Sequence, residues 1–335
     1  MNKDSVLTQL LAGRQPGRIP VIFTGAALAA RMAGCSLAGI RDNGALLAEV
    51  QDNFQKETGM DWCVVYADAL AIPEALGIPV EISPVSGPIG RPGPVPAEVP
   101  VLVPRPFFDS PGTRAILEAV QILKKKRRDL PVAVLFEGPF TTAMRLFEPE
   151  ELMREIFRRP ALVKNIAGRL ADVLGSFAAA ARRAGADLFY IPEPFASMDM
   201  LSARHFREFA GPFISDLIKH IHSLGAGAIL HICGFTAGIW PDMAATGANA
   251  LSLDQKMSMK KARDFFGPGV VLAGNVDPLR TLMEGDPSRV REETRRCIAE
   301  AGPKNLIVMP GCGVPPQADP ANLRVMVETV REITF

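Results

Sequence analysis

The chain has 335 residues, which fits a single α/β barrel with a modest extension. Hydrophobic residues make up 48% and charged residues 22%, so the chain can bury a sizeable core and differs from a disordered protein. The 37 Lys and Arg residues nearly balance the 36 Asp and Glu residues, for a net charge of +1. This balance leaves no basic surface for a polyanion, so nucleic acid is not an expected partner.

The N-terminal residues and the cysteines indicate where the protein resides. Asp4 and Gln9 interrupt the apolar segment that a signal peptide would need. No apolar run approaches the roughly 18 to 20 residues that span a bilayer. The cysteines are odd in number and scattered, which suits a reducing compartment better than a disulfide framework: Cys35, Cys63, Cys233, Cys297 and Cys312. We therefore expect a cytoplasmic protein with no membrane segment, whose thiols are free or bind metal.

Eight short apolar runs predict buried strands. In chain order they are Pro20–Phe23, Trp62–Tyr66, Val132–Phe136, Asp187–Ile191, Ala228–Ile232, Ala250–Leu253, Val270–Ala273 and Leu306–Met309. Helical spacing lies between most of them, for example at Glu150–Arg158, Ala161–Ala184, Ser202–Leu224, Lys260–Phe266 and Pro287–Ala301. This alternation predicts an α/β fold, a closed (β/α)8 TIM barrel with an N-terminal extension, as one domain over residues 1–335.

A doubly wound open sheet is the alternative fold, but no Gly-x-Gly-x-x-Gly follows an early strand to mark a dinucleotide site. The alternation is broken after the second predicted strand, where Pro79–Pro106 contains nine prolines. This Pro-rich excursion predicts an extended arm or hairpin over one barrel face. A lid and a rigid surface loop are both open interpretations.

Barrel active sites lie at the C-terminal ends of the strands, so the residue that ends each apolar run carries the most information. These ends gather polar and metal-binding side chains: Asp68, Glu137, Glu193, His231, Cys233, Asp254, Asn275, Asp277 and Cys312. Buried apolar strands alone would not require this pattern.

The sharpest motif is His231-Ile232-Cys233. Residues i and i+2 of a strand point to the same face, so the imidazole and the thiol can share a ligand. Cys312, flanked by glycines, ends the last strand and can turn inward. One His and two Cys favour Zn²⁺ over Mg²⁺ or Ca²⁺, and Asp254 is a candidate fourth ligand or a partner that orients His231. The alternative is a core His beside two inert thiols.

Five segments resemble the uroporphyrinogen decarboxylase superfamily, and the resemblance covers nearly the whole chain. They are Glu137–Thr141, Ile191–Pro194, His231–Gly234, Gly274–Pro278 and Pro310–Pro316. Within the superfamily, the His-x-Cys motif and the later Cys resemble the zinc-dependent methylcobamide methyltransferases, such as the methylcobamide:coenzyme M methyltransferases. The resemblance implies a (β/α)8 barrel that moves a methyl group from a corrinoid protein to a thiol.

The resemblance also implies a set of cofactors, partners and site residues. Zn²⁺ and a methylcobamide presented by a corrinoid protein are the implied cofactors, and a homodimer is compatible with it. The small-molecule acceptor is coenzyme M, another thiol or tetrahydrofolate. Glu193, Asp68 and Asp254 are the candidate catalytic residues beside the metal, and Asn275 in its Gly-Asn-x-Asp-Pro turn is the candidate cofactor-binding residue. For Glu193 and Asp68, a solvated carboxylate at the rim is the alternative.

Uroporphyrinogen decarboxylase activity is the runner-up function. The decarboxylases' arginine-bearing Met-Arg-Gln-Ala-Gly-Arg motif has no match in residues 20–27, and Gly311-Cys312-Gly313 replaces their Gly-His-Gly. Tyr66-Ala67-Asp68, in contrast, resembles the segment that carries the decarboxylase aspartate. Without its arginines, a substrate with four carboxylates would be poorly held. A non-catalytic corrinoid-binding module is a third option, but it would not need soft metal ligands.

Overall fold

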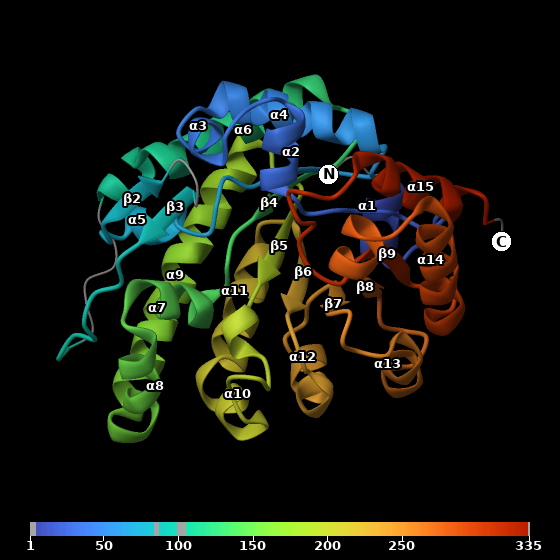
Figure 1. The fold of residues 1–335 in the computed structure, drawn as a ribbon. Helices are drawn as coiled ribbons and strands as arrows, with labels where there is room; N and C mark the ends of the chain where they lie inside the picture. Colours follow the sequence, from blue (N-terminus) through green and yellow to red (C-terminus); the bar gives the residue numbers. More distant parts are fainter. Residues whose placement is uncertain (1–4, 84–86, 99–104, 334–335) are drawn as a thin grey trace.

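A curled parallel sheet of seven strands forms the centre of the molecule (Figure 1). The computed structural model describes residues 5–83, 87–98 and 105–333. Across the sheet the strands are β1 (Cys63–Val65), β4 (Val132–Leu135), β5 (Leu188–Pro192), β6 (Gly227–Ile232), β7 (Ala250–Leu253), β8 (Leu272–Val276) and β9 (Leu306–Pro310). Neighbouring strands pair in parallel and follow one another along the chain. Seven of the eight predicted strands are thus confirmed.

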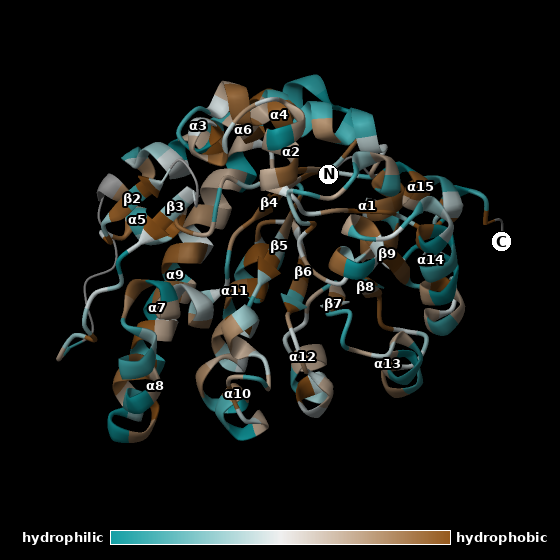
Figure 2. Ribbon diagram, in the orientation of Figure 1, coloured by the Kyte–Doolittle hydropathy of each residue, from teal (hydrophilic) through white to brown (hydrophobic). Residues whose placement is uncertain are grey.

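Helices lie around this sheet and supply the crossovers that parallel strands require (Figure 1). Their bounds are α1 (Val6–Leu11), α2 (Ala26–Met32), α3 (Leu37–Arg41), α4 (Gly44–Thr58), α5 (Ala71–Ala75), α6 (Pro111–Lys126), α7 (Pro139–Leu146), α8 (Pro149–Arg158), α9 (Pro160–Ala184), α10 (Ala203–Phe209), α11 (Gly211–Ser223), α12 (Trp240–Ala245), α13 (Met259–Phe266), α14 (Pro287–Ala301) and α15 (Pro320–Arg331). Figure 2 shows hydrophobic residues, in brown, concentrated on the central strands, and hydrophilic residues, in teal, on the outer surfaces of helices.

One predicted helix is two. The stretch Ser202–Leu224 divides at Ala210 into α10 and α11, and Ala210 lies outside helical geometry. Pro212 follows at the start of α11. Proline suits the first helical turn and has no N–H to continue a preceding helix, which explains the break.

The predicted first strand, Pro20–Phe23, is only a single bridge. Val21 pairs in parallel with Val308 of β9. On its other side, the backbone N–H of Asp61, just before β1, donates to the Val21 carbonyl over 2.8 Å. The segment therefore lies between the two edge strands of the sheet, where an eighth strand would close it. The prediction of eight regular strands was wrong at this position.

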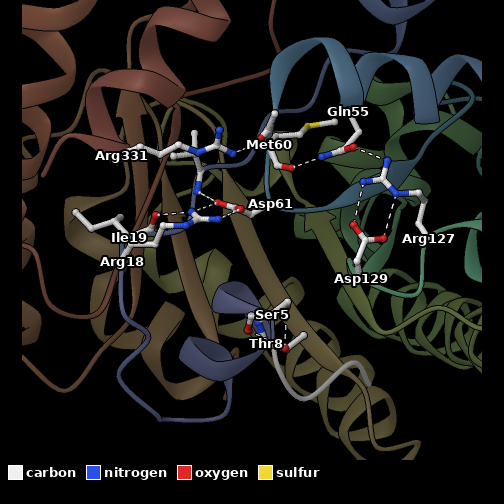
Figure 3. A network of polar contacts seen from close by, with 12 residues as sticks. Ser5, Thr8, Arg18, Ile19, Gln55, Met60, Asp61, Arg127, Asp129 and Arg331 are labelled. Atoms are coloured by element: carbon white, nitrogen blue, oxygen red, sulfur yellow. Dashed lines mark hydrogen bonds and ion pairs between the residues drawn. The ribbon is translucent and has the colours of Figure 1, made fainter. Parts of the chain in front are cut away.

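Asp61 holds this junction through its side chain (Figure 3). Its Oδ2 accepts from Arg18 Nη1 and from the backbone N–H of Val21, each over 2.8 Å. Nearby, Arg331 at the end of α15 donates to the Gly59 carbonyl over 2.7 Å. Polar contacts thus join the N-terminal segment to the entry of β1, and the last helix to the end of α4, against which it packs.

The described part of the Pro-rich segment contains an antiparallel hairpin. Its strands are β2 (Val80–Ser83) and β3 (Gly87–Gly90). Residues 84–86 and 99–104 of the predicted excursion lie outside the described residues. In the part of the chain that the structure describes, no helix is both long and apolar enough to cross a membrane.

Replacing Asp61 with Asn should weaken the fold, because Arg18 and the Val21 N–H would lose their shared charged acceptor. We expect a loss of about 2 to 4 kcal/mol in the free energy of unfolding, measured in urea. The matched control is Asp129→Asn, at an exposed carboxylate that pairs with Arg127, where we expect less than about 1 kcal/mol. Equal losses in the two variants would contradict this role of Asp61.

Candidate metal and substrate site

A cavity of about 860 Å³ opens at the C-terminal ends of the strands. Its walls are mostly apolar and come from strand ends, from the loop after β9 and from the β2–β3 hairpin. The polar side chains that line it are Thr24, Tyr66, Asp68, Glu137, Arg145, Tyr190, His231, Cys233 and Cys312. The cavity therefore lies where barrel enzymes place their active sites.

The structure brings His231, Cys233 and Cys312 together. His231 Nε2 lies 3.1 Å from Cys233 Sγ, and the two Sγ atoms are 3.9 Å apart. The three ligand atoms all lie within 4.8 Å of one another. A Cβ at Gly311 would lie 2.2 Å from the backbone N of Gln255, so only glycine permits the turn that presents Cys312.

The spacing of these atoms fits a zinc ion. A tetrahedral ion with bonds of about 2.3 Å to sulfur and about 2.0 Å to nitrogen places its ligand atoms about 3.5 to 3.8 Å apart. The separations of 3.1 and 3.9 Å bracket this range. One imidazole and two thiolates suit Zn²⁺ and leave a fourth position for water or substrate.

The two thiols of the cluster have divergent acidities. A hydrogen bond from Cys233, with a second contribution from His231, lowers the pKa of Cys312 to about 4. The same contact with Cys312, together with burial, raises the pKa of Cys233. Without a cation, the contact between the two sulfur atoms thus opposes the loss of both protons, and a bound metal ion would favour both thiolates, the form in which cysteine binds metal. By contrast, burial raises the pKa of both Cys63 and Cys297 to about 12, so these thiols stay protonated.

A hydroxyl orients the histidine. His231 Nδ1 lies 3.1 Å from Ser252 Oγ, because the register of β6 and β7 places these residues opposite each other. Tyr190 contacts the same hydroxyl over 3.2 Å and stacks on the imidazole with ring centroids 5.8 Å apart. The sequence did not predict this role of Ser252. Its only signal was that Ser252 is the one polar residue in the apolar strand Ala250–Leu253.

Asp254 and Asn275 organise the neighbouring loops. The two carboxylate oxygens of Asp254 accept backbone N–H groups, one from Gly234 and one from Lys256, each over 2.8 Å. Asn275 Nδ2 donates to the carbonyls of Asp254 and Met257. Neither side chain lines the cavity, and Ser252, not Asp254, contacts His231. A fourth-ligand role for Asp254 and a cofactor-binding role for Asn275 stay predictions.

Glu193 is fully buried beneath the start of α7 and does not line the cavity. Its carboxylate accepts the N–H groups of Phe140 and Thr141 over 3.1 and 2.8 Å. Burial raises the pKa of Glu193 to about 7, although these hydrogen bonds oppose the rise. A Cβ at Gly138 would lie 2.3 Å from this carboxylate, so the glycine makes room for it. The geometry links Glu193 to the position of α7, and its catalytic role stays a prediction.

Asp68 does line the cavity. Its Oδ2 accepts from Arg41 Nε over 2.7 Å, and Arg41 is almost fully buried behind it. A second charged pair lies in the wall. Arg145 donates to Glu137 through Nε, over 3.0 Å, and through Nη2, over 2.9 Å. The sequence marked Glu137 as a strand end, but it gave no sign of Arg145, which lies at the far end of α7.

Ser252→Ala should weaken metal binding, because the His231 ring would lose the partner that directs Nε2 toward the thiols. We expect zinc affinity, measured by competition with a chromophoric chelator, to fall about 10-fold to 100-fold. Ser176→Ala is the control, at a hydroxyl that only caps a carbonyl within α9. If Ser252→Ala and Ser176→Ala bind zinc with equal affinity, Ser252 has no orienting role.

Comparison with known families agrees with this geometry. The family model described as uroporphyrinogen decarboxylase (URO-D) matches residues 2–333. The chain belongs to the uroporphyrinogen decarboxylase family.

The relatives similar to this chain include proteins named as methyltransferases and proteins named as decarboxylases. The methylcobamide:CoM methyltransferase MtbA of Methanosarcina acetivorans is 29% identical over 66% of this chain, and the match spans 64% of that relative's length. A uroporphyrinogen decarboxylase of Chlorobium phaeovibrioides is 28% identical over 86% of this chain and 84% of its own length. A solved methyltransferase from Methanosarcina mazei superposes with a TM-score of 0.90 at 25% identity, covering 98% of both chains. Membership of the family alone does not separate methyl transfer from decarboxylation.

Proposed function

We propose that this protein is a zinc-dependent methyltransferase, which moves a methyl group from a methylated corrinoid on a partner protein to a small thiol. The observation that carries the proposal is the convergence of His231, Cys233 and Cys312 at one wall of the cavity. The names of the similar MtbA protein and of the solved methyltransferase support it. Coenzyme M is the acceptor that the name of MtbA indicates, and tetrahydrofolate is the other candidate.

Each residue near the cluster has a defined task in this proposal. When bound, zinc would keep the acceptor thiol deprotonated at neutral pH and so maintain it as a nucleophile. Cys233 and Cys312 supply two negative charges, which balance the dication. In the tautomer that metal binding through Nε2 requires, His231 Nδ1–H would donate a hydrogen bond to Ser252 Oγ, which leaves Nε2 to face the thiols. The apolar walls limit water, which strengthens the charge interactions inside the cavity.

The cavity argues against decarboxylation of uroporphyrinogen. Thr24, Gly25, Ala26 and Ala27 line the wall at the place where the decarboxylases' arginine motif would fall. Among the described residues, Arg145 is the only Lys or Arg that lines the cavity. One guanidinium can bind one anionic group but cannot match the four carboxylates of uroporphyrinogen.

Two features of the fold are also proposed: closure of the sheet into a barrel, and a lid over the cavity. We infer that the segment at Val21 closes the sheet into a barrel, which its contacts with Val308 and Asp61 support. We infer that the β2–β3 hairpin acts as a lid, because Pro88, Ile89 and Gly90 line the cavity. The corrinoid protein as partner, a homodimer and a cytoplasmic location stay predictions.

The zinc-loaded protein should demethylate free methylcobalamin when a thiol is added, as followed by the change in corrinoid absorbance. Because Cys312 is a proposed ligand, Cys312→Ala should lose at least about 100-fold in rate. The matched control is Cys35→Ala, since Cys35 does not line the cavity. Formation of coproporphyrinogen from uroporphyrinogen, without demethylation of methylcobalamin, would establish the decarboxylase function instead.

A further inference from the structure

The Glu137–Arg145 pair leaves part of the arginine available. Arg145 donates to Glu137 through Nε and Nη2, which is the side edge of the guanidinium. Among the residues that the structure describes, Nη1 donates to no protein acceptor, and the Phe195 ring lies 5.3 Å from the guanidinium carbon. The Nη1–Nη2 edge therefore keeps unused N–H groups, in the fork geometry that matches two oxygens of one anion.

Tyr66 adds a second donor to the same wall. Its side chain lines the cavity with Arg145, and in the described structure its hydroxyl has no hydrogen-bond partner. Burial, with the nearby charges of Glu137 and Asp68, raises the pKa of Tyr66. The hydroxyl therefore keeps its proton at neutral pH and can donate it to a ligand.

The acidic groups of this wall are already occupied. Asp68 accepts from buried Arg41 and from the backbone N–H of Leu70, and Glu137 accepts both bonds from Arg145. Neither carboxylate is left to bind a cation. The wall thus presents donors to a ligand, and the bidentate contact with Glu137 fixes the direction in which Arg145 presents them.

We propose that Arg145 and Tyr66 bind the anionic group of a small thiol acceptor and so determine the preference for anionic over uncharged thiols. This inference rests on the proposed function. Glu137 is a positioning residue for Arg145 and does not touch the ligand. The thiol of such a molecule would face the His231–Cys233–Cys312 cluster, which lines the same cavity.

The kinetic test compares acceptors that differ in charge. With free methylcobalamin, kcat/KM is measured for 2-mercaptoethanesulfonate, 3-mercaptopropionate and uncharged 2-mercaptoethanol, which also separates a sulfonate from a carboxylate. In Arg145→Met the preference for the anionic thiols should fall about 10-fold to 100-fold, the value of a charged hydrogen bond. Arg154→Met, an exposed arginine of α8, is the control and should keep the preference. An unchanged preference in Arg145→Met would overturn the proposal.

Two further variants protect the test against misfolding. Arg145→Met leaves Glu137 without its cation, so the double variant Glu137→Gln with Arg145→Met removes both charges together and should show the same loss of preference. Tyr66→Phe keeps the ion pair and should lose part of the preference. If the double variant and Tyr66→Phe, both folded by circular dichroism, keep the wild-type preference, the subsite is wrong.

Binding separates this inference from the proposed function. Ethanesulfonate has the anion but no thiol, so its affinity, measured by calorimetry, requires neither zinc nor methyl transfer. It should bind the wild type about 10-fold or more tightly than Arg145→Met. If no thiol demethylates methylcobalamin but ethanesulfonate binding depends on Arg145, the function fails and the subsite stands. If methyl transfer proceeds without any such dependence, the subsite fails alone.

Discussion

The side-chain alternation of β6 is the constraint on which the whole site depends. Because successive residues of a strand point to opposite faces, His231 and Cys233 approach each other while Ile232 is buried in the core. The parallel register with β7 then places Ser252 beside the outer nitrogen of the imidazole. A shift of the strand by one residue would turn His231 away from the cavity and remove both contacts.

Most of the acidic side chains around this site accept hydrogen bonds from backbone N–H groups. Asp254 accepts two of them in the loops after β6 and β7, and Glu193 accepts two at the start of α7. At the junction of the sheet edges, Asp61 accepts one from Val21. A buried carboxylate is costly unless it is hydrogen-bonded, and these contacts meet that requirement. Asp254 in this way holds the backbone directly after Cys233, one of the proposed metal ligands, without itself lining the cavity.

The sequence predicted the features that follow from the order of apolar runs along the chain, namely the strands and the residues at their ends. Apolar runs located seven strands, and the rule that strand ends converge placed Cys312 near His231, although 80 residues separate them in the sequence. It could not predict cross-strand register, which places Ser252, or the reach of Arg145 back to Glu137 across α7. Glu193 shows the same limit, because its position after β5 does not reveal that its side chain turns toward a helix terminus. Pro20–Phe23 has the apolar pattern of a strand but makes only one bridge.

X-ray absorption at the zinc edge tests the central claim most directly. In the proposed site, His231, Cys233 and Cys312 bind one zinc ion, and an acceptor thiol joins them. Protein loaded with one equivalent of zinc should show two sulfur ligands at about 2.3 Å together with nitrogen or oxygen ligands. Addition of an acceptor thiol should raise the sulfur count to three, and Cys312→Ala should lower each count by one. A zinc ion with only nitrogen and oxygen ligands, or a sulfur count that does not change with the thiol, would contradict the account.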